Sequence, residues 1–296
     1  MTVVDAPPAP RRVDLPVLAS LVAVTAWGFG PLSVRGISAS APTIAFYRFA
    51  VAVPVFWLIA HFTGGRVDRR LLRAALAPGL CFGASFITSF ESFQRTSIAN
   101  ATLIGALTPV VIMPIAALTM GDRLGGRRIG LGVLAMVGVA ITVLGASNTS
   151  GASLDGDLLA VGTLLLFGGQ LLLVKRRRDL GVHPWAMVAA VSIVGFVVVL
   201  PWSLALSDDF GAFGGGDWLL LSLMILGPGI TGHGLMTWAQ AHVDASVTAL
   251  LMLASPVISA LGAWVFFEQA LSGWQMLGAG VVLGALAAVV STNRRR

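Results

Sequence analysis

The chain of 296 residues is strongly apolar, with a mean hydropathy of +0.89, 56% hydrophobic residues and only 11% charged residues. Soluble domains contain about 25% charged residues. Apolar runs of about 20 residues recur along the chain, and a helix of that length crosses a bilayer core. The composition therefore predicts an integral membrane protein. It excludes a soluble catalytic or nucleic-acid-binding domain, in spite of the net charge of +6.

Ten membrane-spanning helices are predicted after a Pro-rich tail at residues 1–14, which we expect to be disordered. They cover residues 15–34, 43–62, 71–91, 97–119, 127–147, 157–174, 184–206, 217–240, 245–267 and 273–292. The shortest polar break, residues 91–96, separates the third span from the fourth. The predicted fold class is an all-α integral membrane protein.

The basic residues are distributed unevenly between the two sides of the membrane. Nearly all of the 19 Lys and Arg residues lie in loops of one side, at residues 11–12, 66–73, 123–128, 175–178 and 294–296. The loops of the other side carry only Arg35 and Arg95. Basic loops stay in the cytoplasm. We therefore predict a multi-pass protein of the cell (inner) membrane with both termini cytoplasmic.

The stretch from Arg95 to Arg128 has a weaker copy from His242 to Gln275, and the prolines of the two copies, Pro109 and Pro256, lie 147 residues apart. Self-similarity at a fixed offset indicates a duplicated unit. Two copies of five spans each must face opposite ways. The predicted architecture is two inverted five-helix repeats around a central cavity, with the substrate site near the midplane between the halves.

The domain boundaries follow from this duplication. The first repeat is predicted at residues 15–147 and the second at residues 157–292. A periplasmic linker at residues 148–156 joins them, and residues 293–296 form a basic cytoplasmic tail.

Both halves carry a Ser/Thr-Pro pair, then an acid, a leucine and glycines. These are Thr108-Pro109, Gly121-Asp122, Leu124, Gly130 and Gly132 in the first half, and Ser255-Pro256, Glu268, Leu271, Gly278 and Gly280 in the second. With these motifs the chain resembles the EamA type of the drug/metabolite transporter (DMT) superfamily. In length and build it is most similar to the YddG-like amino-acid exporters. The resemblance implies a cavity lined by spans 1, 3, 4, 6, 8 and 9. The second half departs from the pattern, because Ala190 stands where Arg48 would be repeated.

The predicted function is export of small polar metabolites, with amino acids as the first choice, by alternating access. Broad drug efflux is an alternative, and proton antiport and uncoupled facilitation are both open. The sequence has no Gly-rich phosphate loop to drive transport with ATP. An intramembrane transferase would need clustered acids or metal ligands, which the sequence lacks. The expected partners are a small-molecule substrate, the lipid bilayer and protons, with no cofactor and no nucleic acid, in a monomer or weak homodimer.

Arg48 and Glu91 lie at similar depth near the outer ends of the second and third spans. Ionisable groups at membrane depth are costly and mark functional sites. We predict that the two side chains pair, directly or through water, either as a gate or proton-sensing pair near the outer mouth or as an ion pair that locks two helices together.

The side chains predicted to line the cavity are aromatic groups, hydroxyls, amides and one imidazole: Trp27, Phe82, Ser85, Phe86, Ser89, Asn100, Thr108, Gln170, His233, Thr237 and Ser255. The aromatic and serine residues of the third span share one helix face. Their hydroxyls could equally bond carbonyls of their own helix.

His233 and the two repeated prolines have alternative roles. His233 suits a ligand contact or a proton relay, because histidine titrates near neutral pH, or it bonds a neighbouring carbonyl. Pro109 and Pro256 are predicted to kink their spans, either as hinges or as static kinks. No catalytic residue and no metal site is predicted.

Overall fold

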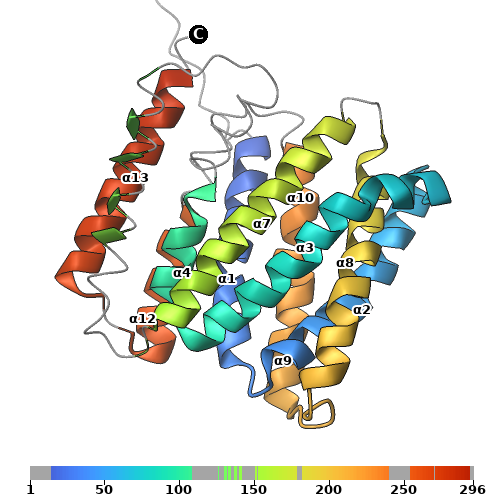
Figure 1. Cartoon of the computed structure of the whole chain (residues 1–296), viewed down its shortest axis with the longest axis horizontal. Coiled ribbons are helices and arrows are strands. Elements are labelled where there is room, and N and C mark those ends of the chain that lie inside the picture. The colour runs from blue at the N-terminus through green and yellow to red at the C-terminus, as the bar shows by residue number, and fades with distance from the viewer. Residues whose placement is uncertain are drawn as a thin grey trace, which may run out of the picture.

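The structure is a computed structural model that describes residues 15–108, 153–178, 182–239, 254–269 and 271–293, together with residues 126, 130–131, 133–134, 137–138, 140–141 and 151. All regular secondary structure in these residues is helical, and the long helices lie side by side as a bundle (Figure 1). Five described helices are long and apolar enough to cross a bilayer. They are α1 (Leu15–Gly36), α2 (Ala41–Phe62), α3 (Arg69–Arg95), α7 (Leu154–Arg178, with its apolar span at Leu154–Val174) and α8 (Pro184–Leu206).

The structure describes further helices. They are α4 (Ile98–Gly105), α12 (Ala254–Phe267), α13 (Gly273–Asn293), and a stretch in which α9 (Gly215–Met224), the π-helix η1 (Ile225–Thr231) and α10 (Gly232–Ala239) follow without a break. These helices overlap the predicted spans, but α4 and α12 cover only parts of those predicted at 97–119 and 245–267, and most of the span predicted at 127–147 lies outside the described residues. Two helices extend further than predicted. The helix α7 runs to Arg178, and α3 continues through Glu91 to Arg95, so that only Thr96 and Ser97 separate it from α4.

Local sequence explains where the helices begin. Asp68 caps α3 by accepting a hydrogen bond from the backbone N–H of Leu71 at 2.7 Å. The helices α2 and α8 carry a proline in the first turn, where no intrahelical N–H bond is lost. Pro228 instead lies inside η1. A π-helical turn is one way in which a helix absorbs the missing N–H of an internal proline.

Glycines bring α3 and α8 into close contact. A Cβ added to Gly79 would lie 2.4 Å from the Cβ of Val194, and one added to Gly83 would lie 2.6 Å from the carbonyl oxygen of Gly195. Small residues at helix interfaces allow such backbone approach in membrane proteins. A hydroxyl pair, Thr88 with Thr163 at 2.7 Å, joins α3 to α7 on another face.

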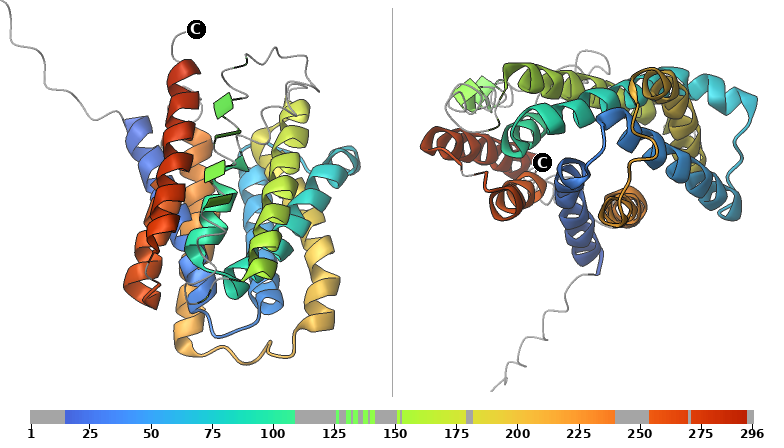
Figure 2. Two further views of the ribbon diagram at one scale, coloured as in Figure 1. Left: turned by 60° about the vertical axis from the view of Figure 1, so that its left-hand side comes forward. Right: turned by 90° about the horizontal axis from the view of Figure 1, so that it is seen from below.

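At one end of the bundle, the loop at residues 37–40 packs against the loop at residues 207–214 (Figure 2). The carboxylate of Asp209 accepts hydrogen bonds from the backbone N–H and the hydroxyl of Ser40, at 2.6 and 2.8 Å, and from the hydroxyl of Thr43. Partial burial raises the pKa of Asp209, but these hydrogen bonds outweigh it and lower the pKa below its ordinary value. Asp209 therefore joins the two loops in its ionised form.

The end of α3 contributes to the same contact. The Gln94 side chain donates to the carbonyl of Ala39 at 2.8 Å and accepts from the N–H of Ala41 at 3.1 Å. The Arg35 guanidinium donates to the carbonyls of Phe93 and Gln94 at 3.0 and 2.6 Å. Carbonyls at a helix end lack intrahelical partners, and Arg35 satisfies two of them. We call residues 37–40, 93–95 and 207–214 together the closed end.

Candidate functional site

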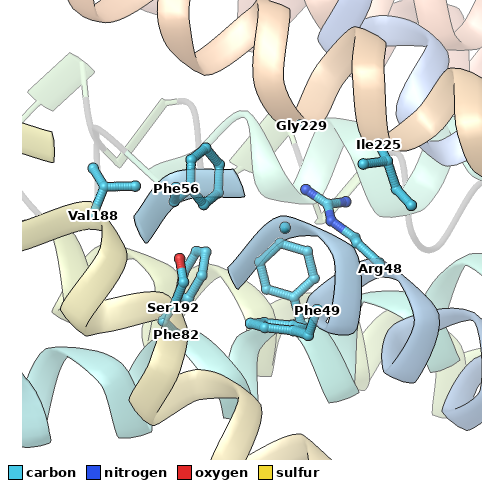
Figure 3. A pocket seen from close by; sticks show the side chains of 10 residues that line it. Arg48, Phe49, Phe56, Phe82, Val188, Ser192, Ile225 and Gly229 are labelled. Carbon is cyan, nitrogen blue, oxygen red and sulfur yellow. The ribbon is translucent and has the colours of Figure 1, made fainter. Parts of the chain in front are cut away.

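A pocket lies among α2, α3, α8 and η1, within the membrane-spanning part of the bundle (Figure 3). It is lined by Arg48, Phe49, Ala52, Phe56, Phe82, Phe86, Val188, Ser192, Ile225 and Gly229. The space inside it that is open to water is about 30 Å³, which suffices for one or two water molecules. Sites for small organic molecules measure roughly 300–1,000 Å³. The pocket as it stands is therefore too small for such a molecule, and we call it contracted.

Arg48 supplies the charge of this pocket. Its guanidinium carbon lies 4.4 Å from the centre of the Phe86 ring and 5.8 Å from that of Phe90. Such cation–π contacts contribute roughly 0.5–2 kcal/mol, which is less than the cost of an unpaired charge in a membrane. Within the described residues, no carboxylate pairs with Arg48. The pocket thus holds one positive charge between aromatic walls (Figure 3).

The structure corrects the predicted pairing of Arg48 with Glu91. The Oε2 atom of Glu91 instead lies 2.7 Å from Nη2 of Arg95, one helical turn further along α3. Arg48 approaches α3 on the side of Phe86 and Phe90. Glu91 follows Phe90 directly and is turned by about 100° around the helix axis. Similar depth therefore does not bring the two groups together.

The predicted aromatic face of α3 contributes two residues to the pocket. Phe82 and Phe86 belong to its wall, and their rings contact each other edge to face at a centroid distance of 4.8 Å. The hydroxyl of Ser85 is buried and donates to the carbonyl of Phe82 at 2.7 Å. Ser89 is half-buried on α3 and is not part of the pocket wall. Ser85 thus follows the alternative of a bond within its own helix.

Trp27 lies beside the pocket rather than in its wall. Its indole Nε1–H donates to the carbonyl of Pro228 at 3.0 Å and so joins α1 to η1. The contact is close, because a Cβ added to Gly232 would lie 2.6 Å from the same Nε1 atom. Trp27 therefore holds the π-helix that forms one wall of the pocket.

Asn100 lies in a buried polar network instead of the pocket. Its side-chain amide donates to both carboxylate oxygens of Asp157, at 3.3 and 3.2 Å, and its carbonyl oxygen accepts from Gln275 at 2.8 Å. The hydroxyl of Thr96 donates to Asp157 at 2.7 Å. Asn100 is fully buried. The network connects α4 with α7 and α13, which indicates a structural role.

Thr108, Gln170 and Ser255, which were also predicted to line the cavity, are not in the pocket wall that the structure describes. The Thr108 hydroxyl donates to the carbonyl of Gly105 at 2.7 Å. The side-chain oxygen of Gln170 is buried and has no hydrogen-bond partner within the described residues. Ser255 is half-buried and Pro256 buried on α12. The side chains of His233 and Thr237, on α10, and the whole of Pro109 lie outside the described part of the chain.

Several pocket residues were missed, and α2 and α8 were not among the spans expected to line the cavity. Arg48, Ala52 and Phe56 follow one another at intervals of four residues, which places them on one face of α2. Val188 and Ser192 have the same spacing on α8. The helix face that carries the lone intramembrane arginine was therefore the signal that could have identified these residues.

The model of the EamA-like transporter family matches residues 15–144 and, separately, residues 154–291. The chain belongs to this family. The resemblance to the EamA type is thereby confirmed, and the protein is a membrane transporter rather than an enzyme.

Relatives of this EamA-like transporter match over nearly their whole length. An uncharacterised transporter of Archaeoglobus fulgidus is 26% identical over 276 residues, which is 90% of this chain and 95% of the relative. The pseudopaline exporter CntI of Pseudomonas aeruginosa is 22% identical over 266 residues, 88% of this chain and 90% of the relative. A solved crystal structure with 20% sequence identity has the same fold, with a TM-score of 0.66 over 95% of this chain and 98% of that one.

Proposed function

We propose that this EamA-like transporter exports small polar metabolites, with amino acids and related acids first among them, across the cytoplasmic membrane by alternating access. The observation that carries the proposal is the pocket among α2, α3, α8 and η1, because it contains a lone arginine within the membrane-spanning part of a transporter. One relative is named as an exporter, which supports the outward direction. Proton antiport and uncoupled facilitation are two forms of this proposal.

The helix contacts support two inverted five-helix repeats. In an inverted duplication, α7, α8, the α9–η1–α10 stretch and α12 are the equivalents of α1, α2, α3 and α4, respectively. A contact between a helix of the first half and a helix of the second half is then matched by a contact between their two equivalents. The helix α1 packs against α10 and α12, and α7 packs against α3 and α4. The helix α2 packs against α8, its own equivalent. The family model also matches the two halves separately.

The position of the pocket fits this symmetry. Its four walls consist of two equivalent pairs, α2 with α8 and α3 with η1. The pocket then lies on the interface of the two repeats, where transporters built in this way bind their substrates. The positive-inside rule favours a cytoplasmic position for the basic loops, and this supports a periplasmic position for the closed end.

Uptake into proteoliposomes tests the proposal. The purified protein is reconstituted, and the flux of labelled amino acids, other organic acids and cationic amphiphiles is measured with and without a pH gradient. Ala52→Leu adds volume to the pocket wall, whereas Val51→Leu introduces the same side chain on the exposed face of the same helix. We expect saturable flux that Ala52→Leu reduces at least about tenfold, since overpacking of a contracted site is costly, and that Val51→Leu leaves unchanged.

The possible outcomes separate the functions. Flux that requires the pH gradient supports proton antiport, and flux without it supports facilitation. Uptake of cationic amphiphiles alone moves the assignment to broad drug efflux. No saturable flux of any compound, with protein that elutes as a single folded species, contradicts the proposed function.

A further inference from the structure

We propose that the pocket recognises carboxylates with an apolar or aromatic body, and that Arg48 is the residue that contacts the carboxylate group. The inference rests on the proposed function and names the substrate class for that pocket. It makes a defined prediction about charge: a singly negative substrate binds better than a zwitterion of the same shape, and a cation of that shape does not bind.

The positive charge of Arg48 favours binding of an anion. The guanidinium has aromatic rings beside it but no carboxylate partner among the described residues. A charge without a counter-ion inside a membrane raises the free energy of the protein. Binding of an anionic group next to Arg48 lowers that free energy, and this favours anionic ligands. The guanidinium is planar and donates in parallel pairs, which matches the two oxygens of a carboxylate.

The walls of the pocket determine the rest of the substrate. Phe49, Phe56 and Phe82 lie around the space next to Arg48 (Figure 3), and Phe86 belongs to the same lining. Phe49 contacts both Phe82 and Phe86 edge to face, at centroid distances of 5.9 and 5.2 Å. When the helices separate, these contacts open and expose ring faces and edges. An aromatic or branched aliphatic group can replace the lost ring contacts.

The lining also explains why a free amino group gives no advantage. Ser192 provides the only polar side chain of the described lining besides Arg48, and none of the lining residues is acidic. An ammonium group placed here would lose its hydration and gain no carboxylate. It would also lie close to the positive charge of Arg48, and like charges repel strongly at low dielectric constant. A blocked or absent amino group avoids both costs.

Three compounds with the same side chain and different charge test the inference. N-acetylphenylalanine is an anion, phenylalanine a zwitterion and phenylalaninamide a cation. Each is used as a competitor of the flux established for the wild-type protein in proteoliposomes, and each is also offered as a labelled substrate. We expect inhibition in the order N-acetylphenylalanine, phenylalanine, phenylalaninamide, with at least about a tenfold difference between acid and amide, because hydrogen bonds to charged groups are strong.

Variants of Arg48 provide a second test, which asks whether this residue causes the preference for the acid. Arg48→Gln is expected to abolish the preference for the acid over the amide, and Arg48→Lys to retain part of it, because lysine keeps the charge without the planar pair of donors. Arg70→Gln makes the same chemical change at an exposed position at the start of α3 and serves as the matched control. We expect it to leave the acid preference at the wild-type value.

The failure of this inference differs from the failure of the proposed function. Wild-type protein that carries phenylalaninamide as well as it carries the acid, or an Arg48→Gln variant with unchanged acid preference, overturns the inference while transport stands. Absence of saturable flux for every compound overturns the proposed function instead. The comparison of acid with amide in the wild-type protein decides the charge preference without any variant, and the Arg48 variants decide which residue causes it.

Discussion

Replacement of Asn100 by leucine tests the buried network that joins α4, α7 and α13. Leucine has a similar volume but no polar atom. The change removes both hydrogen bonds from the Asn100 amide to Asp157 and leaves the amide of Gln275 without its acceptor. Asp157 would then keep the hydroxyl of Thr96 among the partners that the structure describes.

The expected cost follows from these lost bonds. A buried polar group that loses its partner costs about 1–3 kcal/mol, and more when it is charged, whereas hydrogen bonds within membranes average only about 0.6 kcal/mol. Two groups lose partners here, so we expect a loss of about 2–4 kcal/mol in the free energy of unfolding. For a chain of this size, that corresponds to a fall of roughly 5–10 °C in Tm.

Thermal unfolding in detergent, followed by tryptophan fluorescence, measures this effect. Thr102→Val is the control, because the hydroxyl of Thr102 bonds only carbonyls of α4, at 2.7 Å to Ile98 and 3.2 Å to Ala99. The double variant Asn100→Leu with Gln275→Leu should cost less than the sum of the single changes, since residues in contact are not additive. An Asn100→Leu protein with wild-type Tm and a changed KM for transport would refute this reasoning and support a role of Asn100 in the substrate cavity.

Three further variants have defined outcomes. Gly79→Ala places a methyl group 2.4 Å from the Cβ of Val194. We therefore expect α3 and α8 to separate and the free energy of unfolding to fall by about 1–3 kcal/mol. Gly105→Ala is the control and should leave Tm nearly unchanged, because the space around its Cβ is open. Asp209→Asn should lower Tm at neutral pH, and the difference in Tm from wild type should vanish only below about pH 4. The reason is that a carboxylate with a lowered pKa stabilises the fold above its unfolded pKa and loses that contribution as the pH falls through the folded pKa. A constant difference in Tm down to pH 3 would contradict this account. Arg95→Ala breaks an exposed ion pair and should change stability by less than about 1 kcal/mol. A loss of transport flux in this variant at wild-type Tm would restore a gating role for this end of α3.

The helices could be predicted because apolar runs and capping residues are local in the sequence. The proline in the first turn of α2 and Asp68 before α3 mark the starts of those helices. Phe82 and Phe86 of the pocket could be found from helical periodicity within one span.

The partners of polar side chains could not be predicted, because they depend on contacts between distant segments. Asn100 bonds Asp157, 57 residues away, and Gln275, 175 residues away. Its polarity alone was equally compatible with a cavity. The depth of Arg48 in the membrane could be predicted from the sequence, but the rotation of α3 about its axis could not. That rotation turns Phe86 rather than Glu91 toward Arg48.

The lone arginine of the pocket also has an electrical consequence. For a carrier that takes up a monoanion at Arg48, the empty site is positive and the loaded site is neutral. A membrane potential of 100 mV does about 2.3 kcal/mol of work on one elementary charge that crosses the bilayer, which equals a concentration ratio of roughly fiftyfold. In a cell whose interior is negative, this work drives an anion outward. The potential alone could then sustain export of such a substrate, with no proton exchanged for it.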